Sequence, residues 1–163
     1  AQALEQYQKA NESRPRDAAL LDKLASAHLY LGNFLEAETI SEQMLELGMD
    51  VFVPVAHSHF SNCEGELRLR KGKLTFTSGT SDHSFVASRS DLVEMRLVTE
   101  DLWLEFKVRG QDGTEKKFAL LPLIFASRVE GAFRTKEHGI RQSRVPDHRK
   151  LLNLIKRLIE RYL

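Results

Sequence analysis

Short segments of alternating apolar and polar residues follow one another from Val51 to Leu121, and this feature most constrains the fold. The segment from Cys63 to Arg70 alternates cleanly, Lys71-Gly72 is a turn, and the segment from Lys73 to Thr77 returns with the same alternation. The whole stretch predicts about seven short strands in an antiparallel arrangement that has one face to cover.

Two residues in this strand-rich stretch depart from the simple pattern. Pro54 has no backbone N–H, so it predicts a sheet edge or a bend in its strand. Trp103 lies on the polar face of its strand, between charged neighbours, and a large aromatic side chain there is usually covered. We expect the N-terminal helices or the C-terminal tail to cover it, with a partner contact as the alternative.

Apolar residues at helical spacing predict two helices between Asp17 and Leu47. Asp17 is the expected N-cap of the first helix, Gly32-Asn33 the turn between the two, and Gly48 the stop after the second. Positions 34 residues apart also share character: Ala3, Tyr7, Ala10 and Pro15 precede Ala37, Ser41, Met44 and Met49.

This period and pattern resemble the tetratricopeptide repeat, with one full repeat after half of another. The residues that match the full repeat are Leu21, Leu24, Ala25, Gly32, Phe34 and Ala37. The pattern departs at Ser41, which replaces a bulky residue, at Met49, which replaces a proline, and at His28, which replaces an aromatic residue. Because so few repeats cannot bury their apolar face alone, we expect further repeats upstream and a neighbouring surface, in the next domain or a second chain.

The resemblance implies a peptide-binding groove along the first helix of the repeat. In that family the first helices line the concave face, so the implied contact residues are Asp22, Ser26, Leu29 and Tyr30. The alternative is that the helical hairpin is only a spacer that leads into the next domain.

The sequence that follows the strands predicts two helices. The first spans Phe125 to Glu137, and a loop from Gly139 to Val145 follows it. The second spans Asp147 to Leu163, with Asp147 as its cap and an apolar stripe along one face.

About seven strands followed by an amphipathic helix resemble the pleckstrin-homology-like fold, a bent antiparallel β-sandwich or barrel with a C-terminal capping helix. Cys-x-Gly-x-Leu-x-Leu at Cys63–Leu69 and His-Ser-Phe at His83–Phe85 resemble its bacterial members. The expected class is therefore α+β. Residues 1–49 would form the tetratricopeptide-like helices and residues 50–163 the pleckstrin-homology-like domain.

His57, His59, Cys63 and His83 are the best metal candidates, because histidines two residues apart share one face of a strand. No second cysteine supports a paired-cysteine site, so hydrogen-bonded side chains at a sheet edge are the favoured interpretation. The sequence has no glycine-flanked serine elbow and no phosphate-binding loop. We therefore expect no catalytic residue, no cofactor and no metal.

Charge is unevenly distributed along the chain. Residues 1–50 carry a formal charge of −5, residues 51–126 carry 0 and residues 127–163 carry +6. This split predicts attraction between the two ends of the chain, or a basic face that meets an acidic partner. The alternative is a tail helix whose charged side chains are only solvated.

A basic hairpin raises the question of anionic ligands. Some pleckstrin-homology domains bind phosphoinositide headgroups through basic residues in the loop between their first two strands, and here that loop, Ser58–Asn62, has none. The basic residues Arg68, Arg70, Lys71 and Lys73 lie on the next hairpin, where they predict at most weak attraction to anionic membranes. Aromatic residues do not interleave with them, so we expect no nucleic acid.

These observations predict a non-catalytic adaptor or scaffold that binds a protein or peptide. The alternatives are docking to anionic lipid headgroups through the basic hairpin and homodimerisation through the unfinished repeat. The single cysteine, Cys63, and the absence of a long apolar run favour a cytoplasmic protein, with any targeting segment upstream.

Overall fold

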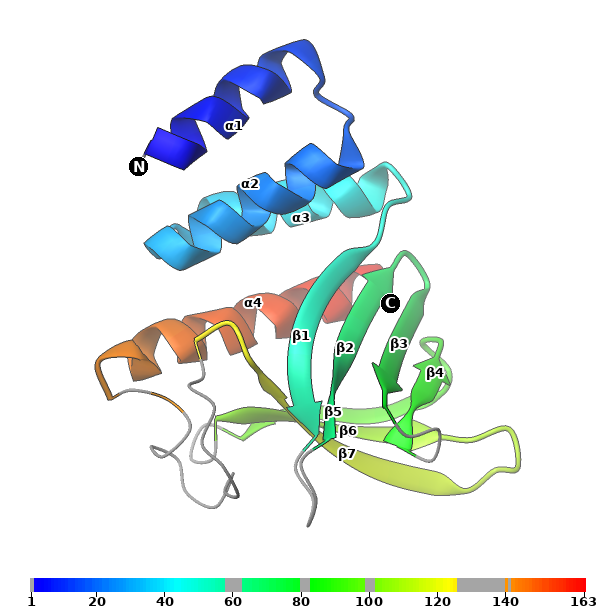
Figure 1. Cartoon of the computed structure of the whole chain (residues 1–163). Helices are drawn as coiled ribbons and strands as arrows, with labels where there is room; N and C mark the ends of the chain where they lie inside the picture. The colour runs from blue at the N-terminus through cyan, green and yellow to red at the C-terminus, as the bar shows by residue number, and fades with distance from the viewer. Residues whose placement is uncertain (1, 58–62, 80–82, 99–101, 126–139, 141) are drawn as a thin grey trace.

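The computed structural model describes residues 2–57, 63–79, 83–98, 102–125, 140 and 142–163 (Figure 1). The class is α+β, as predicted. Three helices come first, a seven-stranded antiparallel sheet follows, and a helix ends the chain. The helices are α1 (Gln2–Ser13), α2 (Ala18–Leu31), α3 (Phe34–Glu46) and α4 (Val145–Tyr162), with a short 3-10 helix at Gln142–Arg144. The strands are β1 (Val51–His57), β2 (Cys63–Arg70), β3 (Lys73–Ser78), β4 (Phe85–Ala87), β5 (Leu92–Val98), β6 (Trp103–Arg109) and β7 (Glu115–Pro122).

The two helices expected between Asp17 and Leu47 are confirmed as α2 and α3. The Asp17 carboxylate accepts a hydrogen bond from the backbone N–H of Leu20 at 3.1 Å, so the predicted N-cap is correct. α3 ends where Gly48 takes a left-handed conformation, as predicted.

The strands form one continuous sheet in the order β4-β3-β2-β1-β7-β6-β5. The sheet curves strongly, and α4 crosses one end of it (Figure 1). β1 and β7, the first and last strands in the sequence, lie side by side in the middle of the sheet and join its two halves. They pair over only three residues of β1, Val55–His57. Pro54 lies just before this paired stretch, and its carbonyl accepts a hydrogen bond from the backbone N–H of Leu123 at 2.8 Å. Because the ladder with β7 begins only at Val55, the missing N–H of Pro54 is tolerated in a strand at the middle of the sheet.

The predicted hairpin of β2 and β3 is confirmed, with Arg70 paired to Lys73 across the turn. Gly72 supplies the left-handed backbone that the turn needs, with φ of 78°. Its N–H donates to the carbonyl of Tyr162 at 2.7 Å, which ties the turn to the end of α4.

α4 begins two residues earlier than predicted, at Val145, and its N-cap position is Arg144. Asp147 was expected to cap this helix. It lies instead in the first turn, where its carboxylate pairs with Arg144 at 3.4 Å and faces the positive end of the helix dipole. The earlier start is compatible with Pro146, because proline fits the first turn of a helix. The expected stripe is buried, at Leu151, Leu154, Ile155, Leu158, Ile159 and Tyr162.

α3 packs against α4 through apolar contacts and ion pairs. Ala37 and Leu45 of α3 belong to the same buried cluster as the strands and α4. The Arg157 guanidinium donates to both oxygens of the Glu38 carboxylate, at 2.8 and 2.5 Å, and Arg161 pairs with Glu42. The predicted attraction between the acidic start and the basic end of the chain is therefore confirmed.

Some predicted features cannot be followed. The helix expected at 125–137, apart from Phe125, and the whole loop at 58–62, including His59, lie outside the described residues. Of the loop expected at 139–145, residues 139 and 141 lie outside them. The rest is not all loop, because Gln142–Arg144 form a 3-10 helix and Val145 begins α4.

Gly65 of β2 offers a direct test of the packing inside the curved sheet. A Cβ atom there would lie 2.8 Å from the Phe76 ring and closer still to the carbonyl oxygen of Thr77. We expect Gly65→Ala to lower the free energy of unfolding by about 1–3 kcal/mol, measured by urea denaturation. Gly79→Ala is the control, because a Cβ atom there meets nothing within 4 Å. Equal stability of the two variants would contradict the close approach of β2 and β3.

His148 makes stability depend on pH. It is fully buried in α4, and its Nε2–H donates to the carbonyl of Leu102 at 3.0 Å. Leu102 has φ of 60°, which costs a non-glycine residue about 1 kcal/mol, so the bond holds a strained backbone. Burial lowers the pKa of His148 from 6.5 to about 4, although the hydrogen bond to Leu102 opposes this shift.

Between those two pH values the unfolded chain binds more protons at this position than the folded chain. The stability that neutral His148 maintains is fully present above pH 6.5 and is lost as the pH falls towards 4. The expected loss is about 3 kcal/mol in free energy of unfolding. Urea denaturation should show this loss in the native chain and a smaller one in His148→Gln. The same loss in both would mean that other groups cause it.

Candidate functional site

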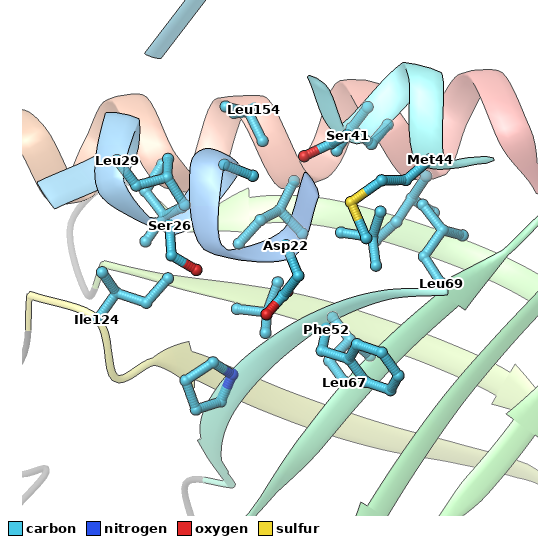
Figure 2. A pocket seen from close by; sticks show the side chains of 18 of the residues that line it. Asp22, Ser26, Leu29, Ser41, Met44, Phe52, Leu67, Leu69, Ile124 and Leu154 are labelled. Carbon is cyan, nitrogen blue, oxygen red and sulfur yellow. The ribbon is translucent and has the colours of Figure 1, made fainter. Parts of the chain in front are cut away.

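A cavity lies where the N-terminal helices meet the sheet and α4. Its volume is about 150 Å³. Most of its wall is aliphatic or aromatic, and Figure 2 shows the side chains around it. The lining residues come from α2 and α3 (Asp22, Ala25, Ser26, Leu29, Tyr30, Ser41, Met44), from β1 and β2 (Val51, Phe52, Val53, Pro54, Leu67, Leu69), from the segment after β7 (Ile124) and from α4 (Leu151, Leu154, Ile155, Leu158, Ile159).

The four groove residues predicted from the repeat pattern all line this cavity: Asp22, Ser26, Leu29 and Tyr30. They share one face of α2, because residues three and four apart lie above one another on a helix. Asp22 and Ser26 extend from α2 towards the strands (Figure 2). The implied concave face of the hairpin therefore looks onto β1 and the segment after β7.

Ser41 helps to keep the cavity open. It stands where the repeat pattern has a bulky residue, and its hydroxyl donates to the carbonyl of Ala37 at 2.9 Å on its own helix. A leucine at this position would fill space that the serine leaves empty. The departure from the repeat pattern thus coincides with the wall of the cavity.

Asp22 is the only carboxylate among the residues that line the cavity. The residue as a whole is exposed, but partial burial of its carboxyl group raises the pKa. The negative charge of Glu66 raises this pKa further, whereas Lys23 lowers it. A cation placed at the mouth of the cavity would relieve this unfavourable environment.

The sequence missed the other walls of the cavity. Phe52 was assigned only to a strand and Leu154 only to an apolar stripe, whereas Ile124 lies between the last expected strand and the helix expected from Phe125 and had no assignment. Phe52 carries one signal that could have been read, since it is a large apolar residue on the face of β1 opposite the buried Val53 and Val55. The contribution of α4 depends on packing between distant segments, which no local pattern reveals.

Trp103 does not join this cavity. It is half-buried at the start of β6, and its indole N–H is buried without a hydrogen-bond acceptor among the described residues. Its side chain is therefore less exposed than its polar neighbours suggested, and the described residues leave its proposed role in binding untested.

The basic hairpin is largely neutralised by acidic neighbours. Arg70 pairs with Asp50 at 2.5 Å, Arg68 lies 3.2 Å from Glu66 and 3.8 Å from Asp50, and Lys71 lies 3.1 Å from Glu46. Lys73 shares a shallow depression with the two arginines and Asp50. These ion pairs leave less uncompensated positive charge than the sequence alone indicated.

Three of the four candidate metal ligands come together at the other end of β1, namely His57, Cys63 and His83. The fourth candidate, His59, lies outside the described residues.

Comparisons with known proteins do not identify a relative. No protein-family model matches the chain, and neither the curated proteins nor the solved structures contain a significant match. Among the described residues, none of the helices combines the length and the apolar character needed to cross a membrane.

Proposed function

We propose that the chain is a non-catalytic adaptor module, in which the cavity between α2 and the sheet binds an apolar segment of a partner protein. The observation that carries this proposal is the convergence of Asp22, Ser26, Leu29 and Tyr30 on one apolar cavity. The resemblance of the helices to tetratricopeptide repeats and of the strands to a pleckstrin-homology-like domain belongs to the same proposal.

The position and the wall of the cavity support binding. Ligand sites in proteins are mostly apolar, contain a few polar groups and often lie where two substructures meet. A cavity of about 150 Å³ lined by aliphatic side chains is large enough for a benzene-sized ring, so it would hold one large apolar side chain.

Asp22 indicates the charge of the partner. Its raised pKa reflects a carboxylate that is partly desolvated and close to Glu66. A lysine or arginine next to the apolar anchor would pair with Asp22 and offset both effects. The expected ligand is therefore a peptide that combines a large apolar residue with a nearby basic one.

The two alternatives have less support. Docking to anionic lipid would use the charges of Arg68, Arg70, Lys71 and Lys73, and the first three of these have acidic partners. Homodimerisation would need an unpaired apolar face on the opening helices. α1 buries no residue among those described, but nothing in the structure indicates a second copy of the chain as its cover.

Selection from a random peptide library displayed on phage tests the proposal. We expect the enriched peptides to combine a large apolar residue with lysine or arginine. Fluorescence anisotropy should then show that Ser41→Leu, which fills the cavity, weakens binding at least about tenfold, or ~1.4 kcal/mol. Asp22→Asn should weaken binding less and reduce its dependence on salt.

Thr39→Leu is the matched control. Thr39 lies on the same helix, also donates its hydroxyl to the carbonyl four residues earlier, and is exposed away from the cavity. This variant should bind like the native chain. Peptides that bind Ser41→Leu as tightly as the native chain would contradict the proposed site. Vesicles of phosphatidylserine that sediment the chain, when no peptide is enriched, would favour lipid docking instead.

A further inference from the structure

A histidine, a cysteine and a second histidine meet at the end of the curved sheet that points away from the helices (Figure 1). The three available ligand atoms, one from each of His57, Cys63 and His83, all lie within 4.8 Å of one another. His57 and Cys63 are buried, and His83 is half-buried. Among the described residues, no other group of metal-ligating side chains is gathered in this way.

The strand register holds the first two ligands. His57 is the last residue of β1, Cys63 is the first of β2, and the two are directly paired. Side chains of paired residues point to the same face, with Cβ atoms about 4.5–5.5 Å apart. Both lie on the interior face of the sheet, which they share with Val53, Val55 and Leu67.

His83 reaches the same place from a different segment. It lies two residues before β4, and the adjacent Ser84 accepts a hydrogen bond from the backbone N–H of Ser78 at the end of β3. The rings of His57 and His83 are 5.3 Å apart between centroids, at an angle of 76°. The His57 ring also lies next to the rings of Phe76 and Phe118, with centroids 6.0 and 5.6 Å away.

This set of ligands suits zinc. Zn²⁺ binds imidazole nitrogen at about 2.0–2.1 Å and thiolate sulfur at about 2.3 Å, so the two nitrogens and one sulfur of a tetrahedral site lie about 3.3–3.6 Å apart. Ligand atoms already within 4.8 Å reach this spacing through small side-chain rotations. Three protein ligands leave a fourth tetrahedral position for water.

We propose that His57, Cys63 and His83 form a binding site for a zinc ion. The expectation from sequence was that no metal binds here, because no second cysteine is present. The structure supplies a third ligand in place of a second cysteine, because it brings His83, 20 residues beyond Cys63, next to His57 and Cys63. The ion would join β1, β2 and the start of β4 at the end of the sheet that α4 does not cover.

Titration of the metal-free, tag-free chain with zinc chloride tests the proposal. We expect calorimetry to show one tight site per chain. With cobalt chloride in place of zinc, we expect a thiolate-to-cobalt absorption band in the near ultraviolet. Cys63→Ala should abolish this band, and both Cys63→Ala and His83→Gln should weaken zinc binding at least about tenfold, since even indirect partners of a metal have effects of that size.

His28→Gln is the control, because His28 is also buried but lies on α2 outside the group. It should bind zinc like the native chain. Circular dichroism of each metal-free variant checks that it folds, and His83→Gln is informative even if Cys63→Ala does not fold, since His83 is only half-buried. A native chain that binds no zinc, or variants that bind as tightly as the native chain, would overturn the proposal, the latter indicating an adventitious ion only.

Discussion

The contact between α3 and α4 is the interaction on which the rest of the structure depends. A hairpin of two short helices gains little stability alone, because most helix stability in proteins comes from packing of an apolar face. Here Ala37 and Leu45 enter the buried cluster of the strands, and the ion pairs Glu38–Arg157 and Glu42–Arg161 flank that contact. The side-chain hydrogen bond from Arg157 lowers the pKa of Glu38, as expected for a carboxylate held in its charged form.

α4 connects the two parts of the molecule. Its apolar stripe covers the end of the sheet, its fully buried His148 bonds to Leu102 before β6, and its last turn accepts the N–H of Gly72 between β2 and β3. Because α3 packs on the same helix, α2 is held above β1 and the segment after β7, and the cavity lies between α2 and these segments (Figure 2). The proposed binding site thus depends on the contact between α3 and α4.

Local patterns were sufficient for much of the fold. The cap at Asp17, the hairpin around Gly72 and the shared face of Asp22, Ser26, Leu29 and Tyr30 follow from residues close together in the chain. The opposite wall of the cavity and the approach of His83 to Cys63 arise from packing between distant segments, so the sequence could not predict them. The start of α4 was misjudged because Asp147 resembles a cap while Pro146 can itself lie within a first turn.

Native-state hydrogen exchange tests most directly whether the helices and the sheet form one unit through α3 and α4. The account predicts that the slowest amides of α2 and α3 exchange with the same free energy of opening as those of β1, β2 and α4. It also predicts that Arg157→Ala lowers the free energy of opening of α2 and α3 more than that of the strands. Slow exchange in the sheet combined with independent, much faster opening of α2 and α3 in the native chain would contradict it.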